Sequence, residues 1–166
     1  MKRVFLVFAV LGLLAGCGSK NEGVQSNSSD PSQAMAAVSG SANPNIAKGV
    51  NYLHQGNIKE AIKSFDEAIR ANPKDVQGYL ILGQTYMHLK DYSRAIDTFA
   101  VATRVAPESG QAHYLLAANF GLAGNFKMAQ LEAEKSLRIF RTSRDEENFK
   151  RSLALLQSLP QPAAKP

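Results

Sequence analysis

The most constraining feature of this 166-residue chain is a set of landmarks that recur at intervals of 34 residues. A short unit cannot bury its own apolar face, so a recurring unit predicts a stack in which each copy packs against its neighbours. We expect three units, over residues 42–75, 76–109 and 110–143. The landmarks are an aromatic residue (Tyr52, Tyr86, Phe120) and an alanine (Ala61, Ala95, Ala129).

The middle unit carries the most complete motif. Its residues follow the order aromatic-x-x-Leu-Gly-x-x-Tyr, then Ala-x-x-x-Phe, then Pro. This order resembles the tetratricopeptide repeat (TPR), a pair of antiparallel helices. The resemblance implies an all-α fold, a tetratricopeptide-repeat α-solenoid of three helix pairs plus a C-terminal capping helix. The residues that carry it are Tyr79, Leu82, Gly83, Tyr86, Ala95, Phe99, Ala102 and Pro107.

The two outer units match the repeat less well. In the first unit, Asn45 and Lys48 stand where an aromatic residue and a leucine are usual. In the third unit, His113, Ala133 and Arg141 replace the opening aromatic residue, the phenylalanine and the proline. Terminal repeats are expected to be atypical because one side of each faces solvent. We interpret His113 as a partly buried substitute for the aromatic residue.

Turn residues predict where the helices of each pair begin. Asn43 followed by Pro44 predicts the start of the first helix. Inside each pair, small residues such as Gly49 and Gly83 are expected to let the two helices approach closely. An Asn or Asp recurs at the turn within each pair and is expected to cap the second helix through its side chain: Asn57, Asp91 and Asn125.

Residues 144–159 do not match the start of a fourth unit. Ser143 and Glu146 stand in a capping-box relation at their beginning. We interpret 144–159 as a helix that caps the third pair, and residues 160–166 as a disordered tail. The apolar stripe of this helix consists of Phe149, Leu153 and Leu156.

The start of the chain predicts a targeting segment. Lys2 and Arg3 precede an apolar run, residues 4–14, which is too short to span a bilayer comfortably. The sequence Leu-Ala-Gly-Cys follows and resembles the lipobox of bacterial lipoproteins. The resemblance implies that residues 1–16 are a signal peptide and that Cys17, the only cysteine, carries a lipid anchor that includes palmitate. The alternatives are an ordinary cleaved signal with an accidental cysteine, and an uncleaved anchor.

The segment after the cysteine indicates where the repeats would act. Residues 17–43 are rich in Ser, Asn, Gly, Gln and Ala and predict a flexible tether, with a root-mean-square span of about 30 Å. In enteric bacteria, Asp directly after a lipidated cysteine favours the inner membrane, whereas this chain has Gly18. We therefore expect a lipid-anchored protein of the bacterial cell envelope, on the outer membrane and facing the periplasm.

The charge of the chain gives no support to nucleic-acid binding. The formal net charge is +5, and without Lys2 and Arg3 there remain 17 basic and 14 acidic residues, a net charge of +3. No recognition-helix, zinc or RNA-binding motif accompanies this small excess. We therefore expect no nucleic-acid partner.

Charged residues near the C-terminus are interpreted as a solvated end of the stack. Glu134 with Arg138, and Glu147 with Arg151, have the i, i+4 spacing of helical ion pairs. A surface for anionic lipid or for a partner is the alternative for the basic group: Arg138, Arg141, Arg144, Lys150 and Arg151.

The sequence predicts no catalytic residue, metal site or cofactor. His54 and His88 are 34 residues apart and fall at equivalent places on successive helices. Packed helices are about 8–10 Å apart, whereas two ligands of one zinc ion must each lie about 2 Å from it. A small-ligand-binding, metal-binding or enzymatic role, and a structural self-associating role, are the alternatives to protein binding.

The binding surface is expected on the first helix of each pair. In the TPR resemblance these helices line a concave groove that accepts a peptide or a partner's helix. Their side chains here are apolar or neutral, which disfavours the Lys/Arg/Asn clamp for a terminal carboxylate and favours a hydrophobic or amphipathic segment. Several of them would alternatively pack neighbouring repeats together. The candidate groove residues are Ile46, Val50, Leu53, Leu80, Gln84, Met87, His88, Tyr114 and Ala118.

Together these features predict a membrane-anchored, non-catalytic TPR lipoprotein that acts as a scaffold in envelope assembly. Lipoproteins of similar layout include type IV pilus pilotins and adaptors that gather peptidoglycan-remodelling enzymes. The better-known pilotins carry about six repeats, against three here. The expected partner is an envelope protein or peptide segment bound in the groove.

Overall fold

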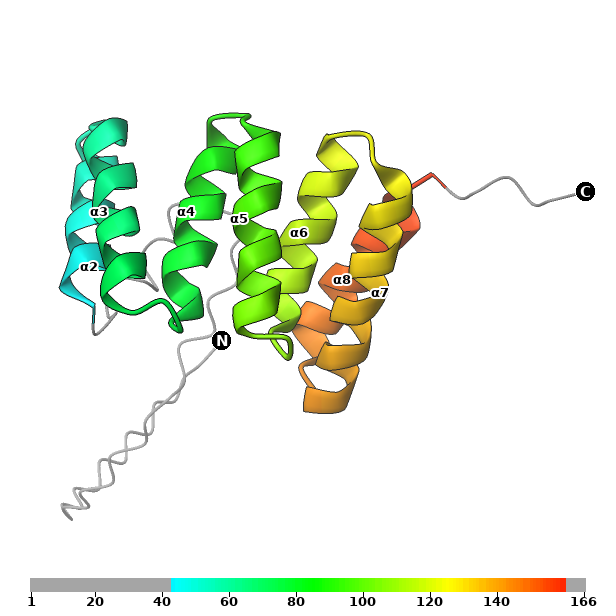
Figure 1. The fold of residues 1–166 in the computed structure, drawn as a ribbon. Coiled ribbons are helices and arrows are strands. Elements are labelled where there is room, and N and C mark those ends of the chain that lie inside the picture. Colours follow the sequence, from blue (N-terminus) through cyan, green and yellow to red (C-terminus); the bar gives the residue numbers. More distant parts are fainter. Residues whose placement is uncertain (1–42, 161–166) are drawn as a thin grey trace, which may run out of the picture.

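The computed structural model describes residues 43–160, which form helices and no strands. The helices form three pairs and one additional C-terminal helix, which confirms the predicted all-α fold of three pairs plus a capping helix (Figure 1). The predictions for the signal peptide, Cys17, the tether and residues 161–166 lie outside the described residues. The helices are α2 (Pro44–His54), α3 (Ile58–Ala71), α4 (Val76–His88), α5 (Tyr92–Val105), α6 (Gly110–Leu122), α7 (Phe126–Ser143) and α8 (Glu146–Ser158).

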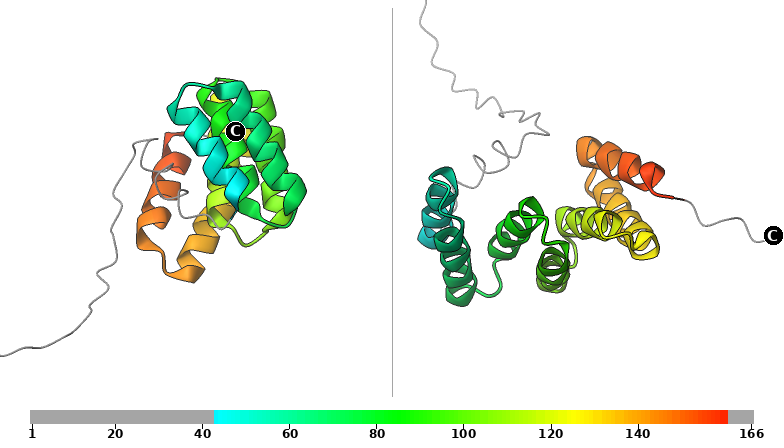
Figure 2. Two further views of the ribbon diagram at one scale, coloured as in Figure 1. Left: turned by 90° about the vertical axis from the view of Figure 1, so that its left-hand side faces the viewer. Right: turned by 90° about the horizontal axis from the view of Figure 1, so that it is seen from above.

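The helices alternate between two sides of the stack. We call the first helix of each pair, α2, α4 and α6, an A helix, and the second, α3, α5 and α7, a B helix. The A helices lie on the same side of the stack as α8 (Figure 2). Helix α8 packs against α7 and touches α6, just as α6 packs against α5 and touches α4. The capping helix thus takes the place of the A helix of a fourth pair.

A glycine and a phenylalanine bring the two helices together in each of the first two pairs. A Cβ atom added to Gly49 would lie 2.3 Å from the ring of Phe65, and one added to Gly83 would lie 2.6 Å from the ring of Phe99. Both phenylalanine side chains are fully buried. The predicted close approach is therefore confirmed, and its reason is that each ring occupies the volume of the missing side chain.

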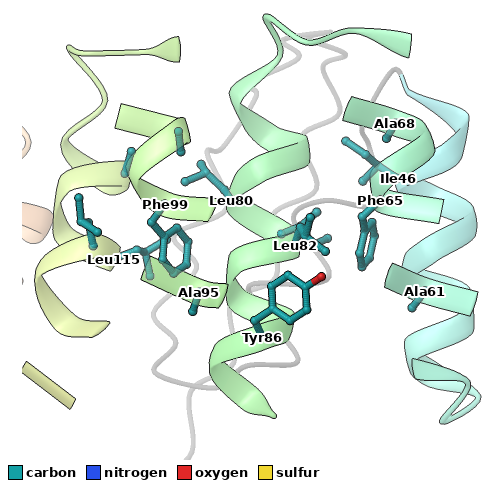
Figure 3. Close-up of a cluster of buried hydrophobic side chains, with 14 of the residues drawn as sticks. Ile46, Ala61, Phe65, Ala68, Leu80, Leu82, Tyr86, Ala95, Phe99 and Leu115 are labelled. Carbon is teal, nitrogen blue, oxygen red and sulfur yellow. The ribbon is translucent and has the colours of Figure 1, made fainter. Parts of the chain in front are cut away.

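The core continues from one pair to the next. Figure 3 shows its labelled side chains crossing the stack from Ile46 and Phe65 through Leu82 to Phe99 and Leu115. All five are at least nine-tenths buried. A stack of this kind buries its apolar surface between neighbours, as the recurring sequence unit requires.

Most of the predicted helix caps are present. Asn43, Asp91 and Asn125 each accept a backbone N–H bond at the start of a helix. The predicted cap by Asn57 is wrong, because its side-chain amide donates to Gln55 Oε1 at 3.2 Å and makes no bond to the helix.

The third pair ends later than the repeat pattern predicts. Helix α7 has 18 residues, whereas α3 and α5 have 14 each. The proline that ends a TPR unit is replaced by Arg141, which retains a backbone N–H and lets the helix continue. The chain then turns at Arg144, whose φ of 59° lies in the left-handed region.

The cap of α8 is therefore not the predicted one. Ser143 belongs to α7, and its hydroxyl donates to the carbonyl of Phe140 at 3.2 Å. Asp145 caps α8 instead by accepting from the backbone N–H of Asn148 at 3.1 Å. Beyond the helix, the side chain of Gln130 donates to the carbonyl of Pro160 at 2.6 Å, so this first residue of the predicted disordered tail is held against α7.

Every helix within residues 43–160 is too short or too polar to cross a bilayer.

Candidate partner-binding surface

Three of the nine predicted groove residues belong to the core. Ile46, Val50 and Leu80 are only 0%, 2% and 3% exposed. Each lies on an A helix, and the helices packed around it cover the side chain. The prediction that these three line an open groove is corrected accordingly, because such side chains stabilise the stack and offer no surface to a partner.

The other six predicted residues remain accessible. Five are half-buried and His88 is exposed. They come from all three A helices and therefore lie on the side of the stack that also carries α8 (Figure 2). Their role in binding stays a prediction. We call them the A-helix surface: Leu53, Gln84, Met87, His88, Tyr114 and Ala118.

The A helices carry no carboxylate side chain. Helices α2, α4 and α6 contain neither Asp nor Glu, whereas all three B helices contain both signs of charge. The A-helix surface is therefore neutral to weakly basic, and an acidic group of a partner would meet no like charge on these helices. The basic side chains of the A helices are Lys48, His54, His88 and His113.

Met87 is fixed between two A helices. The side-chain amide of Asn119, on α6, donates to Met87 Sδ at 3.3 Å and to the carbonyl of Leu115 at 2.9 Å. Asn119 is fully buried, and its Oδ1 atom has no hydrogen-bond partner. A flexible thioether thus covers a buried amide at the centre of the A-helix surface.

His113 takes over the hydrogen bond of the aromatic residue that it replaces. In the second pair, the hydroxyl of Tyr79 donates to the carbonyl of Pro73 at 3.1 Å. In the third pair, His113 Nε2 lies 3.0 Å from the carbonyl of Pro107, the equivalent proline. The prediction of a substitute for the aromatic residue is confirmed. With 7% exposure His113 is buried, and it makes a polar contact that the pattern did not indicate.

That additional contact is an ion pair with α7. His113 Nδ1 lies 2.6 Å from Glu132 Oε2, and Lys135 Nζ lies 2.8 Å from Glu132 Oε1. Burial raises the pKa of Glu132, but the hydrogen bonds from Lys135 and His113 outweigh burial and hold this pKa below its usual value of 4.5. Both ring nitrogens of His113 face an oxygen atom, Nδ1 that of Glu132 and Nε2 that of Pro107.

Arg151 approaches the A-helix surface from α8. Its Cζ atom lies 5.3 Å from the centroid of the Tyr114 ring, and its Nη1 donates to Asn148 Oδ1 at 3.0 Å. The predicted ion pair with Glu147 is wrong, as is that of Glu134 with Arg138, since neither is within salt-bridge distance.

Sequence reasoning placed Arg151 in a solvated basic end and missed its stacking on Tyr114. Which side chains of α8 face Tyr114 depends on the residue at which α8 begins, and this in turn depends on where α7 ends.

The described residues contain no group of three or more His, Cys, Asp or Glu side chains that would hold a metal ion. His54 and His88 are exposed in the last turns of α2 and α4, where a cationic side chain favourably meets the helix dipole.

The fold and the recurring motif define the class, a tetratricopeptide-repeat solenoid. Residues 46–110 match the family model described as tetratricopeptide repeat. None of the curated proteins matches the chain.

Solved structures confirm this architecture. The TPR2B domain of yeast Sti1, in a complex with pHsp70, has a TM-score of 0.64 at 17% identity, over 69% of this chain and 91% of that one. The type III secretion translocator chaperone SycD of Yersinia enterocolitica, in complex with a peptide of the translocator YopD, has a TM-score of 0.63 at 16% identity, over 69% and 88%. PcrH of Pseudomonas aeruginosa has a TM-score of 0.64 at 18% identity, over 69% and 88%. At such identities the likeness shows the fold.

Proposed function

We propose that this protein is a membrane-tethered, non-catalytic TPR adaptor that binds a segment of another cell-envelope protein on its A-helix surface. The main support for this proposal is the difference in side chains between the A helices and the B helices. The A helices combine accessible apolar side chains, Leu53, Met87 and Tyr114, with a complete lack of carboxylates. Such a surface suits an amphipathic helix or an extended segment with apolar anchors.

Structures of the same fold support protein binding as the mode of action. SycD was solved with a peptide of YopD, and the first TPR of RPAP3 was solved with the HSP90 peptide SRMEEVD. Each of these is a short segment of another protein. For the present chain the apolar A-helix surface favours contacts through side chains of the segment.

A lipid anchor followed by a tether would hold this surface near a membrane. The Leu-Ala-Gly-Cys sequence and the apolar run before it support lipidation of Cys17 in a bacterial envelope, and Gly18 supports the outer membrane facing the periplasm. Stable anchoring needs two or more acyl chains, each stabilised by about 0.8 kcal/mol per buried methylene. The adaptor would then act in envelope assembly, such as pilus or secretion machinery or peptidoglycan remodelling.

Co-purification with matched variants tests the binding. The full chain carries an affinity tag and is extracted from envelopes in mild detergent as wild type, Met87→Lys and Leu131→Lys. Leu131 is an exposed apolar residue of the B helix α7, 45% exposed, so its variant makes the same kind of change away from the A-helix surface. Circular dichroism confirms that the variants remain folded.

We expect at least one envelope protein to co-purify with the wild type and with Leu131→Lys, and to be lost with Met87→Lys. The adaptor role is refuted when no co-purifying protein depends on Met87, or when both variants lose the same proteins. Labelling with palmitate, in the wild type and in Cys17→Ser, tests the anchor separately. An unchanged label in Cys17→Ser would remove the lipid anchor from the proposal.

A further inference from the structure

Tyr114 and Arg151 form a preorganised cationic site at the end of the A-helix surface. Tyr114 stands at the repeat position of Ile46 and Leu80, which are buried, but Tyr114 itself remains partly exposed. The guanidinium of Arg151 stacks over its ring at 5.3 Å. Asn148 holds the guanidinium from the side through a 3.0 Å hydrogen bond. The arginine is therefore oriented before any partner arrives.

The guanidinium forms no ion pair within residues 43–160. The three ion pairs in this range involve Arg94, His113 and Lys135 as cations, and Arg151 belongs to none of them. Its acidic neighbour is Asp145, whose carboxylate accepts from the side-chain amide of Asn148 at 2.8 Å and whose pKa is lowered first by that hydrogen bond and also by the charge of Arg151. Glu147, one turn earlier on the same helix, lies outside salt-bridge distance. The neighbouring A helix α6 has no acidic residue. Of the five N–H groups of Arg151, one donates to Asn148.

We propose that Tyr114 and Arg151 bind a side-chain carboxylate, from Asp or Glu, of the segment that occupies the A-helix surface. This inference rests on the proposed function and defines the partner further, as an apolar segment with an acidic residue at the end that lies nearest α8. Arginine presents a planar fork that pairs with both oxygens of a carboxylate. Stacking on an aromatic ring lowers the entropy lost on binding, since the guanidinium is already held in place.

The apolar neighbours of the site favour a protein segment over a lipid surface. Tyr114 packs against the core and lies on the same side of the stack as Leu53 and Met87, so a ligand at Arg151 continues onto apolar side chains of α4 and α2. A folded or extended segment follows such a path by alternating acidic and apolar residues.

A double-mutant cycle with peptides tests the site. Random 16-residue peptides displayed on phage are selected on the full chain, and those that lose binding to Met87→Lys are retained and synthesised. Each Asp and Glu of a retained peptide is changed in turn to Asn or Gln. Affinities for the wild type, Arg151→Gln and Arg141→Gln are measured by fluorescence anisotropy. Arg141 is a matched control, because it also stacks on an aromatic ring, Phe149, at 5.4 Å, but belongs to a B helix.

We expect one carboxylate of the peptide whose neutralisation weakens binding about tenfold, the size expected for a charge-assisted hydrogen bond. Arg151→Gln is expected to weaken binding by the same factor and to abolish the effect of the peptide change, while Arg141→Gln leaves both unchanged. The inference is overturned when retained peptides bind the wild type and Arg151→Gln equally, with the groove itself intact. Failure to obtain any peptide that depends on Met87 refutes the proposed function, and the carboxylate site with it.

Binding to phosphatidylglycerol vesicles tests whether Arg151 binds lipid instead of a peptide. We expect their binding to the full chain to be unchanged by Arg151→Gln. A tenfold loss of vesicle binding in this variant, without any effect on peptide affinity, would assign the arginine to lipid and overturn the inference.

Discussion

The second and third helix pairs reach the same architecture with different chemistry. In the second pair, Phe99 fills the space below Gly83. In the third pair the equivalent places hold Ala133 and Ala117, both fully buried, and a polar group consisting of His113 and Glu132 lies nearby. The second pair is thus held by apolar packing, whereas part of the third pair depends on the hydrogen bonds of the buried Glu132 carboxylate with His113 and Lys135. Equivalent positions of a repeat can therefore hold different residue types, provided that the space between the helices is filled and the buried polar groups are hydrogen-bonded.

Loss of the phenylalanine ring should have the largest effect on the second pair. Phe99→Ala is expected to lower the free energy of unfolding by about 3–5 kcal/mol, because it leaves a cavity between α4 and α5. Urea unfolding of the full chain followed by circular dichroism measures the change. Phe126→Ala serves as control, since that side chain is 40% exposed and its loss should cost much less. Equal losses in the two variants would contradict the packing described.

Filling the glycine position tests the same contact from the other helix. Gly83→Ala places a Cβ atom 2.6 Å from the ring of Phe99 and is expected to cost about 3 kcal/mol through overpacking. In a Phe99→Ala background, where the second pair has the two alanines of the third, this cost should vanish. An additive double variant would show that the ring does not set the space at Gly83.

The Glu132 carboxylate should make the third pair sensitive to acid. The folded state holds the pKa of Glu132 below 4.5, so its contribution is present above pH 4.5 and is lost as the pH falls through the lowered pKa. At pH 7, Glu132→Gln is expected to cost about 1–2 kcal/mol through the lost charged hydrogen bonds. The difference between wild type and variant should shrink below pH 4.5. Urea titrations between pH 3 and pH 7 measure it, and a difference independent of pH would contradict the ion pair.

Helix caps give the smallest effect and extend the comparison to the first pair. Asn125 accepts a bond from the backbone N–H of Met128 at 3.3 Å, whereas the equivalent Asn57 makes no cap bond. Asn125→Ala is therefore expected to cost about 1 kcal/mol, and Asn57→Ala a few tenths. Thermal unfolding of the two variants distinguishes them, and a larger loss for Asn57→Ala would contradict the assignment.

The repeat spacing was sufficient to predict the helix pairs and their internal contacts. Gly49 and Gly83 were predicted to permit close approach because a recurring glycine beside recurring aromatic residues has a simple steric meaning. His113 was predicted as an aromatic substitute from its place in the repeat. Its pairing with Glu132 was not, because the two residues are 19 positions apart on different helices and no other unit repeats them.

The binding surface was less predictable than the fold. A helical count gives the direction of a side chain from its own helix, but not how far the neighbouring pair covers it. The count predicts that Ile46, Val50 and Leu80 line an open groove, but all three are buried in the core. The start of α8 depends on the extra length of α7. Arg141 stands where a proline would end the helix, and no other residue in the sequence marks where α7 ends instead.

Site-specific photo-crosslinking in intact cells tests the central claim, that the A helices carry the partner. A photoreactive residue is placed at each accessible position of α4 and then of α5, which belong to the same pair and the same sequence motif. We expect crosslinks to another envelope protein at Gln84, Met87 and His88, and none along α5. Crosslinks of equal yield on both helices, or on α5 alone, would contradict it.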